Sequence, residues 1–223
     1  MHIGLIGGIG PAATEFYYRG LIDRHAAAGT CPDLTIAHAD VRDMVRNLAA
    51  PDPKAQAEIF ARLVQRLKAA GAEAAVVTSM GGHFCIKELE SVSPLPMING
   101  VNAVAEEIAR RGLKSIGVMG TRMVMETGLY GRLTSVRVVL PEGDQLQKVH
   151  ETYGAMASVG RITEAQRRFF HAAGRALIDR GADAVLLGGT DLFLAFQGED
   201  PGYPVLDSAD IHVEAVYQRS RQA

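Results

Sequence analysis

Short apolar runs rich in β-branched residues alternate with alanine-rich stretches along the whole chain of 223 residues. This alternation is typical of parallel strands joined by crossover helices, so we expect an α/β fold. The expected helices include Pro53 to Ala70 and Thr163 to Arg180, the second of which begins with a Thr/Gln capping signal. The expected strands are His2 to Leu5, Leu34 to His38, Ala75 to Thr78, Met97 to Asn99, Ser115 to Met119, Arg137 to Leu140, Ala184 to Leu187 and Val205 to Leu206.

The two halves of the chain resemble each other. The segment Leu67 to Ser79 matches Leu177 to Gly189 in a helix end, a glycine, an acidic residue, an apolar strand and small residues after that strand. A second pair, Ile3 to Gly7 and Ile116 to Gly120, recurs at a similar offset. The repeat predicts two pseudo-symmetric lobes, each a parallel sheet flanked by helices.

The repeat also predicts how the chain is divided between the lobes. We expect the first lobe to comprise residues 1–97 together with 208–223, and the second to comprise residues 98–207. In α/β folds of this kind ligands bind beyond the carboxyl ends of the strands, so we expect a site in the cleft between the two lobes. The residues that follow the strands are therefore the candidates for function.

Charge and composition exclude several classes of protein. The 23 basic and 25 acidic side chains give a formal net charge of −2 without a basic stripe, so nucleic acid is not an expected partner. The longest uncharged stretch, Ser91 to Ala105, is too short to span a bilayer. The N-terminus has no cationic leader, so we expect a cytoplasmic protein without a membrane partner. The two cysteines, without Cys/His clusters around them, predict neither a disulfide framework nor a metal site.

The first expected strand ends in a glycine-rich turn from Gly7 to Gly10, and Pro11 then opens a helix. Backbone amides at such a turn and at a helix N-terminus bind anions, so Gly10 is a candidate for holding a carboxylate. Pro11 interrupts the spacing of a dinucleotide fingerprint, which argues against a nucleotide. The alternative is a tight turn between strand and helix that binds no ligand.

Small and polar residues follow the two strands that the repeat relates. Their hydroxyls and amides can hold a substrate carboxylate and stabilise charge that develops on it, or the small residues only permit close packing of the lobes. His83 is either a catalytic group or a polar residue at a helix start. The candidates are Thr78, Ser79, Met80, Gly81 and His83 after one strand, and Gly188, Gly189, Thr190 and Asp191 after the other.

Further candidates lie elsewhere in the chain. Thr121 follows the strand Ser115 to Met119 and can bond an anion, whereas Arg122 either clamps that anion or lies on the surface. Arg42 is a candidate cation for a side-chain carboxylate. We expect Cys85 to be a buried structural thiol, and Cys31 to lie in a loop outside the site.

In these segments the chain resembles the aspartate/glutamate racemase family, in a superfamily that also includes hydantoin racemases, maleate isomerases and arylmalonate decarboxylases. The resemblance implies a small amino-acid or carboxylate substrate, a homodimer, and chemistry without a nucleotide, pyridoxal phosphate, metal or other cofactor. The matching blocks, in chain order, are GGIGPAAT with Tyr17 and Tyr18, GAEAAVVTS followed by His83, LPMI, IGVMGTRMVME with Tyr130 and Leu133, GRITEA, GADAVLLGGTD and DSADIH.

The resemblance also implies that two residues, one on each lobe, act on opposite sides of the substrate α-carbon, one removing a proton and the other returning one. In the family both are usually cysteines, with threonine sometimes in the first position. Here the two positions fall on Ser79 and Gly189, so both thiols are replaced. Water, His83 or Tyr153, which lies in a segment resembling an active-site-lining part of the family, would then have to act.

Three hypotheses about function remain open. The first is a non-standard isomerase or racemase-like enzyme that works through substitutes for the thiols. The second is a lyase or decarboxylase that uses the same carboxylate cradle, because one-sided chemistry needs at most one protonation. The third is a catalytically silent homologue that binds a carboxylate. Solvent deuterium exchange, loss of CO2, and ligand-dependent stabilisation without turnover distinguish the three.

Overall fold

The computed structural model describes residues 1–222 and divides the chain into two compact units. Unit 1 comprises Met1–Gly100 and the segment from His212 onward, and unit 2 comprises Val101–Ile211. The two boundaries lie three and four residues later in the chain than the expected ones, after residues 97 and 207. Residue 223, the last of the expected first lobe, lies outside the described residues.

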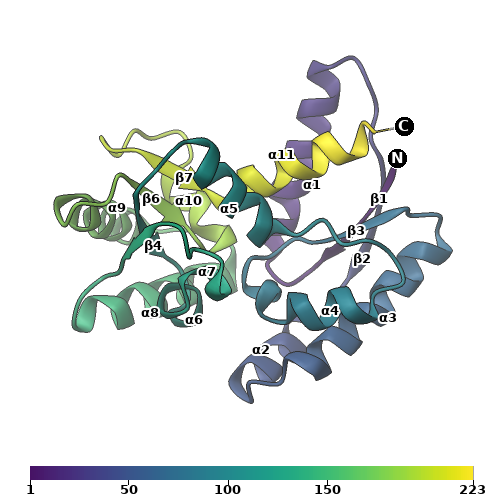
Figure 1. Cartoon of the computed structure of the whole chain (residues 1–223), viewed down its shortest axis with the longest axis horizontal. Coiled ribbons are helices and arrows are strands. Elements are labelled where there is room, and N and C mark those ends of the chain that lie inside the picture. Colours follow the sequence, from purple (N-terminus) through teal and green to yellow (C-terminus); the bar gives the residue numbers. More distant parts are fainter. Residues whose placement is uncertain (223) are drawn as a thin grey trace. The chain divides into compact units, whose positions relative to one another are not determined.

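Unit 1 contains a parallel sheet of three strands in the order β2-β1-β3 (Figure 1). The strands are β1 (His2–Gly7), β2 (Asp33–His38) and β3 (Ala74–Val77). Ile3 of the central strand β1 pairs with Leu34 on one side and with Ala74 on the other. Because the strands are parallel, the residues that follow all three lie at one edge of the sheet.

Helices flank this sheet, and α3 shows how closely they pack. Asp52 caps α3 by accepting a hydrogen bond from the N–H of Ala55 at 2.9 Å, and Pro53 opens the helix. A Cβ on Gly4 of β1 would lie only 2.9 Å from Leu67 of α3, so this glycine lets the helix lie directly on the strand. The helices are α1 (Pro11–Ala27), α2 (Val41–Ala49), α3 (Pro53–Ala69), the 3-10 helix η1 (Gly81–Cys85) and α4 (Ile86–Val92).

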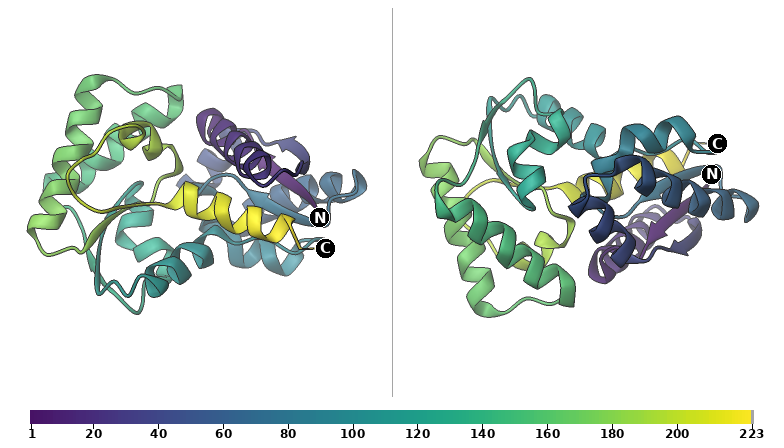
Figure 2. Two further views of the ribbon diagram at one scale, coloured as in Figure 1. Left: turned by 90° about the horizontal axis from the view of Figure 1, so that it is seen from above. Right: turned by 90° about the horizontal axis from the view of Figure 1, so that it is seen from below.

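The C-terminal helix α11 (Ser208–Ser220) belongs to unit 1 from His212 onward. In that unit it lies beside α1, as Figures 1 and 2 show, and Arg24 of α1 forms an ion pair with Glu214 of α11 at 2.8 Å. A Cβ on Gly20 would lie 2.9 Å from Val213, so the two helices are in close contact there. The DSADIH block at residues 207–212 thus leads the chain back into unit 1.

The strand expected from Met97 to Asn99 is reduced to a single bridge between Ala75 and Met97. Ala75 donates its N–H to the carbonyl of Pro96 at 3.0 Å and accepts from the N–H of Ile98 at 2.9 Å. Proline has no N–H to continue a ladder, and a helix begins at residue 100. The expected strand was therefore wrong in extent, although the segment does lie against β3.

Unit 2 contains a parallel sheet of four strands in the order β5-β4-β6-β7 (Figure 1). The strands are β4 (Ser115–Met119), β5 (Arg137–Val139), β6 (Ala184–Leu187) and β7 (Val205–Asp207). The bounds of β4 and β6 agree with the expected ones. The chain is thus an α/β protein with two parallel sheets flanked by helices, as its sequence predicts.

The helices of unit 2 include α9, whose predicted capping signal is confirmed. The Thr163 hydroxyl accepts from the N–H of Gln166, and the Gln166 side chain accepts from the N–H of Thr163. Among residues 1–222, none of the helices combines the length and the apolar character needed to cross a bilayer. The helices are α5 (Gly100–Arg110), which starts at the last residue of unit 1, α6 (Arg122–Glu126), α7 (Gly128–Gly131), α8 (Asp144–Val159), α9 (Glu164–Asp179), η2 (Thr190–Leu192) and α10 (Phe193–Phe196).

The short element α7 is a left-handed turn. Gly128, Leu129, Tyr130 and Gly131 have φ values of 57°, 54°, 57° and 76° in succession. Each of the two non-glycine residues costs roughly 1–2 kcal/mol in this conformation. Thr127 holds the turn, because its hydroxyl accepts the N–H of Tyr130 at 2.9 Å and its carbonyl accepts the N–H of Gly131 at 2.8 Å.

Candidate active site

The turn after β1 is shaped by a required glycine. Gly8 has a φ of 87°, and a Cβ there would lie 2.5 Å from the His38 ring. Gly10 then caps α1, and its carbonyl accepts both the N–H and the hydroxyl of Thr14 at 3.0 Å. The first-turn N–H groups of this 17-residue helix have no partners within the helix, so the end that Gly10 caps can attract an anion.

Two hydroxyls follow β3, and they differ in what they can still donate. Thr78 Oγ1 donates its proton to the carbonyl of Ile6 at 3.0 Å. Ser79 Oγ accepts from the N–H of Gly82 at 3.3 Å, and no acceptor among residues 1–222 takes its own proton. Because a hydroxyl has one proton to donate, Ser79 can still donate to a substrate. The Thr78 hydroxyl instead supports the end of the strand, and substrate binding by Thr78 stays a prediction.

Both ring nitrogens of His83 bond to the backbone of unit 1. A carbonyl can only accept, so Nδ1–H donates to the carbonyl of Ser79 at 2.7 Å, and Nε2 must accept the N–H of Gly100 at 3.1 Å. Burial lowers the pKa of His83 to about 4, so the ring is neutral at physiological pH. In this geometry His83 has no free nitrogen for proton transfer, and it positions the backbone of Ser79 instead.

A second buried histidine, His212, lies next to His83 in unit 1. Its Nε2–H donates to the carbonyl of Ile98 at 2.8 Å, and its Nδ1 accepts the hydroxyl of Tyr17 at 2.8 Å. Burial, together with the neighbouring His83, lowers the pKa of His212 to about 3. Sequence reasoning did not single out His212, although it ends the DSADIH block.

Met80 and Gly81 follow Ser79 and differ in what they contribute. The Met80 side chain is buried against Gly100, where an added Cβ would meet its methyl group at 2.5 Å. Its side chain thus packs within unit 1, and substrate binding by Met80 stays a prediction. Gly81 opens η1, and a Cβ there would lie 3.5 Å from Ser79 Oγ, an ordinary contact.

The two cysteines have the environments that the sequence predicts. Cys85 is buried, and burial with the nearby charge of Glu88 raises its pKa to about 12. Its Sγ donates to the carbonyl of Gly82 at 3.5 Å. Cys31 is exposed and lies in the loop before β2. A thiol with a raised pKa is rarely the reactive thiolate at neutral pH, which fits the structural thiol that we expected at Cys85.

Arg42, the expected cation, is bound to an acidic neighbour. Its guanidinium donates to both carboxylate oxygens of Asp40 at 2.6–3.0 Å, and Asp40 also caps α2. The hydrogen bonds from Arg42 lower the pKa of the Asp40 carboxyl to about 2. Arg42 would have to share or exchange this partner in order to bind a substrate carboxylate.

In unit 2, Thr121 ends the loop after β4 and caps α6. Its Oγ1 accepts from the N–H of Val124 at 3.3 Å, and within the described chain its own proton goes to no acceptor. Arg122 is exposed and donates to Glu126 at 2.9 Å and to Gln147. Of the two alternatives for Arg122, the structure shows the surface position. Thr121 thus keeps a proton for an anion, as Ser79 does in unit 1.

The loop after β6 carries Gly189, which the resemblance aligns with the second thiol. A Cβ on Gly189 would lie 2.4 Å from Cε2, 2.5 Å from Cζ and 2.9 Å from the hydroxyl oxygen of Tyr153 on α8. Cβ atoms are essentially never found so close to other heavy atoms, so the phenol of Tyr153 fills the space of a side chain at this position. The loop then continues into η2 with Thr190, which is buried.

Asp191 of η2 is the hydrogen-bond partner of that phenol. The Tyr153 hydroxyl donates to Asp191 Oδ2 at 3.3 Å, and both side chains are buried. Burial, with the charge of Asp191 and a smaller effect of Tyr130, raises the pKa of Tyr153 well above its usual value. The phenol is therefore protonated at physiological pH. Sequence reasoning named Tyr153 and Asp191 separately, but their contact, and that of Tyr153 with Gly189, came only from the fold.

Asp207, at the carboxyl end of β7, is a titratable residue that sequence reasoning missed. Its Oδ1 accepts the N–H groups of Ala209 at 2.8 Å and Asp210 at 3.4 Å. Burial raises its pKa to about 7, against the effect of these hydrogen bonds. Its partner across the sheet is Leu187, directly before the Gly188-Gly189 loop. A carboxyl with such a pKa can exchange protons near neutral pH.

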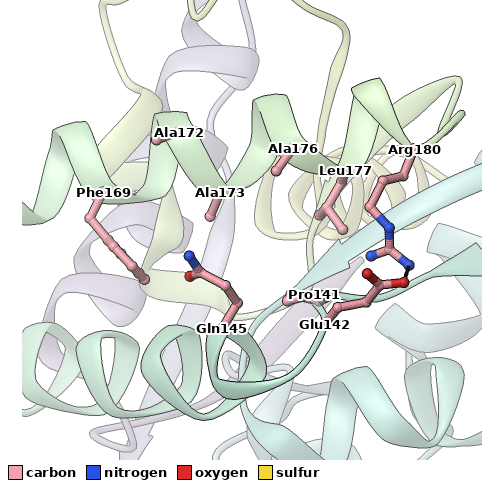
Figure 3. Close-up of a pocket in the computed structure, with 9 residues that line it drawn as sticks. All are labelled: Pro141, Glu142, Gln145, Phe169, Ala172, Ala173, Ala176, Leu177 and Arg180. Atoms are coloured by element: carbon pink, nitrogen blue, oxygen red, sulfur yellow. Dashed lines mark hydrogen bonds and ion pairs between the residues drawn. The ribbon is translucent and has the colours of Figure 1, made fainter.

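Unit 2 also has a pocket of about 280 Å³ between α8 and α9, shown in Figure 3. Apolar side chains such as Phe169 and Leu177 form much of its wall, and Gln145 lies at the α8 side. Arg180 in the wall donates to the carbonyl of Leu140 and to Glu142, so its charge is already paired. None of the candidate residues named above lines this pocket, although Pro141 and Glu142 of its wall follow the carboxyl end of β5.

A model of the Asp/Glu/hydantoin racemase family matches residues 6–216, which is nearly the whole chain. Several solved structures are similar to this chain over nearly its whole length. A candidate Asp/Glu racemase from Yersinia pestis is 28% identical, with a TM-score of 0.86 over 100% of both chains. An aspartate racemase homologue from Pyrococcus horikoshii OT3 is 23% identical, with a TM-score of 0.80 over 99% of both chains. The aspartate racemase of Picrophilus torridus is 19% identical, with a TM-score of 0.78 over 99% of this chain and 94% of its own. The last two likenesses establish the fold.

Proposed function

We propose that this chain, which belongs to the Asp/Glu/hydantoin racemase family, is a cofactor-independent enzyme that acts at the α-carbon of a small amino acid or carboxylate as an isomerase without the two thiols. The observation that carries this proposal is the pair of hydroxyls, Ser79 in unit 1 and Thr121 in unit 2, that keep a proton to donate. Each of these groups, like the N-terminus of α1, is suited to hold a carboxylate or the negative charge that develops when its α-carbon becomes an enediolate.

A lyase or decarboxylase is the second candidate, and one observation favours it. Removing an α-proton requires a base, but both nitrogens of His83 are bound to the backbone, and Ser79 donates to no described base. Decarboxylation breaks a C–C bond and leaves its electron pair on the α-carbon, so no base is needed before the intermediate is protonated. The same hydroxyls would stabilise that intermediate.

The test is incubation of the purified protein in D2O with aspartate, glutamate and small malonate-type diacids, followed by proton NMR and chiral chromatography. Inversion or deuterium incorporation at the α-carbon supports the isomerase, and release of CO2 supports the decarboxylase. Ligand-dependent thermal stabilisation with no turnover of any compound would leave only a silent carboxylate-binding protein and overturn the proposal. We expect activity to survive a chelator and to need no added pyridoxal phosphate.

Variants test the carboxylate-holding role. Ser79→Ala and Thr121→Val each remove one hydrogen bond to a charged group, so we expect each to raise KM about tenfold. Ser91→Ala is the matched control, because Ser91 is exposed and its hydroxyl bonds only within α4, to the carbonyl of Glu88. An unchanged KM in both Ser79→Ala and Thr121→Val would contradict the role of these hydroxyls.

The resemblance further supports a homodimer and a cytoplasmic enzyme, and both remain proposals. Sedimentation at micromolar concentration tests the first, since a monomer there would contradict it. Fractionation of cells that express the full-length protein tests the second. Neither property enters the chemistry proposed here.

A further inference from the structure

We propose that Tyr153 is a catalytic residue that replaces the second thiol, its hydroxyl delivering a proton to the substrate α-carbon beside Gly189, and that Asp191 is the positioning residue for that hydroxyl. This inference rests on the proposed function and names the group that acts at one of its two catalytic positions. All three residues lie in unit 2, so the geometry is that of one compact unit.

The first support is that the Tyr153 side chain occupies the space that a side chain at residue 189 would need. The phenol oxygen lies 2.9 Å from where a Cβ on residue 189 would be, and the ring carbons lie closer still. A thiol at this position would extend one bond beyond that Cβ. The chain has therefore not simply lost a side chain at residue 189, because an O–H group from another helix occupies the same space.

The second support is the way in which the phenol is held. Tyr153 lies on the buried face of α8 with Val149 and Met156, one helical turn before and after it. Its hydroxyl donates to Asp191 Oδ2 at 3.3 Å. Packing at one end and Asp191 at the other thus fix the phenol oxygen beside Gly189. The hydroxyl proton points at Asp191 in this structure, and it turns about the Cζ–O bond toward the substrate before it is transferred.

The protonation state fits an acid rather than a base. Burial and the negative charge of Asp191 raise the pKa of Tyr153, so the phenol carries its proton over the whole physiological range. The phenolate left behind is a weaker base than the α-carbon of an enediolate, so the proton moves toward carbon once the intermediate has formed.

The step balances without a further reactant. The electron pair on the α-carbon of the enediolate forms a C–H bond with the phenol proton, the O–H bond breaks, and its pair stays on oxygen as phenolate. The negative charge thus moves from substrate to Tyr153. Water later returns a proton to the phenolate, and no oxidant or reductant takes part.

The decisive variant is Tyr153→Phe, which removes the oxygen and keeps the ring beside Gly189. We expect turnover to fall by about 10²- to 10⁴-fold, with KM within a few-fold and an unfolding midpoint close to that of the unaltered protein. The matched control is Tyr203→Phe, since Tyr203 is also a buried tyrosine of unit 2 but donates only to the carbonyl of His171 at 2.9 Å. Tyr203→Phe should leave kcat unchanged.

Chemical rescue gives a second readout that a purely structural tyrosine would not show. Tyr153→Ala removes the whole phenol, and added phenol should restore part of the lost turnover, whereas benzene, which lacks the O–H, should not. Asp191→Asn should lower kcat less than Tyr153→Phe. It should also move the high-pH limb of the rate profile to lower pH, because the charge that raises the pKa of Tyr153 is removed.

The outcomes separate this inference from the proposed function. If the unaltered protein turns over a carboxylate and Tyr153→Phe does so equally well, Tyr153 is not the acid although the function stands. The same conclusion follows if benzene rescues Tyr153→Ala as well as phenol does. If the unaltered protein has no activity on any compound of the panel, the proposed function itself fails.

Discussion

The rings of His83 and His212 lie edge to face in unit 1, with their centroids 5.4 Å apart. Together they hold one short segment of backbone, because His212 donates to the carbonyl of Ile98 and His83 accepts the N–H of Gly100. Gly100 is the last residue before the chain passes into unit 2, and His212 is the first after it returns. Both connections between the units are thus anchored on buried imidazoles.

The histidine pair predicts a loss of stability in mild acid. Burial lowers the pKa of His83 to about 4 and that of His212 to about 3, against 6.5 in the unfolded chain. The unfolded state therefore binds more protons below pH 6.5, so the free energy of unfolding falls as the pH drops from 6.5 toward 4. The loss at full titration is on the order of 3 kcal/mol for His83 and on the order of 5 kcal/mol for His212.

Urea unfolding at a series of pH values measures this effect. His83→Gln retains a donor and an acceptor without a titrating ring. We expect the free energy of unfolding of this variant to depend less steeply on pH between 6.5 and 4. His38→Gln, at the exposed end of β2, serves as the control and should retain the slope. An unchanged slope in His83→Gln would show that His83 is not the titrating group.

Asp207 predicts a trend of the opposite sign. Burial raises its pKa to about 7, so the folded protein binds more protons than the unfolded chain between pH 4 and 7. Its contribution to the free energy of unfolding is therefore present at low pH and is lost as the pH rises through 7. Asp207→Asn removes this trend. Thermal unfolding of variant and parent from pH 5 to 8 measures the effect, and the free energy of unfolding of the variant relative to that of the parent should increase with pH. A constant difference would contradict the raised pKa.

A cysteine introduced at residue 189 will not by itself produce racemase activity. The Tyr153 ring occupies the space of a Cβ at residue 189, so a cysteine there meets the ring. Gly189→Cys alone should destabilise the protein by about 1–3 kcal/mol through overpacking. Tyr153→Ala alone should cost about 3–5 kcal/mol through a cavity.

In the double variant Gly189→Cys with Tyr153→Ala, the two changes compensate in volume. Its loss of stability should therefore be smaller than the sum of the two single losses by at least about 1 kcal/mol. Denaturant unfolding of the full cycle measures this coupling. Racemisation should be assayed in the triple variant, which carries Ser79→Cys in addition to these two substitutions. Additive stability losses would mean that the ring of Tyr153 does not fill the site beside Gly189.

The two cysteines should differ in reactivity. In the native protein a thiol reagent such as dithionitrobenzoate should modify Cys31, which is exposed, and spare Cys85, which is buried with a pKa raised to about 12. Both should react after denaturation. Cys85→Ala should leave kcat within twofold, and a large loss in that variant would show that Cys85 takes part in the reaction.

Local signals in the sequence predicted much of the fold. Apolar runs marked β4 and β6 with their observed bounds, and the Thr163/Gln166 signal marked the start of α9, because each depends on residues a few positions apart. The predicted extent of the strand at Met97 was wrong. Backbone hydrogen bonds beside Pro96 decide where the ladder ends, and local apolarity does not.

The candidate site was less predictable, because its chemistry depends on partners far apart in the chain. The Thr78 hydroxyl donates to the carbonyl of Ile6, and His83 accepts the N–H of Gly100. Both contacts follow only from how the strands and helices pack. The contact of Tyr153 with Gly189 likewise joins a helix to a loop 36 positions later. Residue type alone gave the candidates, whereas the fold decided which of them still have a proton or a lone pair to offer.

The fit between Gly189 and Tyr153 also has an evolutionary consequence. One substitution is not enough to place a cysteine at residue 189 without strain, since a cysteine that arrives first meets the ring, and a small residue that arrives first at 153 leaves the interior hollow. Each single substitution lowers stability before the second can compensate in volume. Sequences with a tyrosine at 153 and a glycine at 189 are thus separated from sequences with the reverse sizes by less stable intermediates.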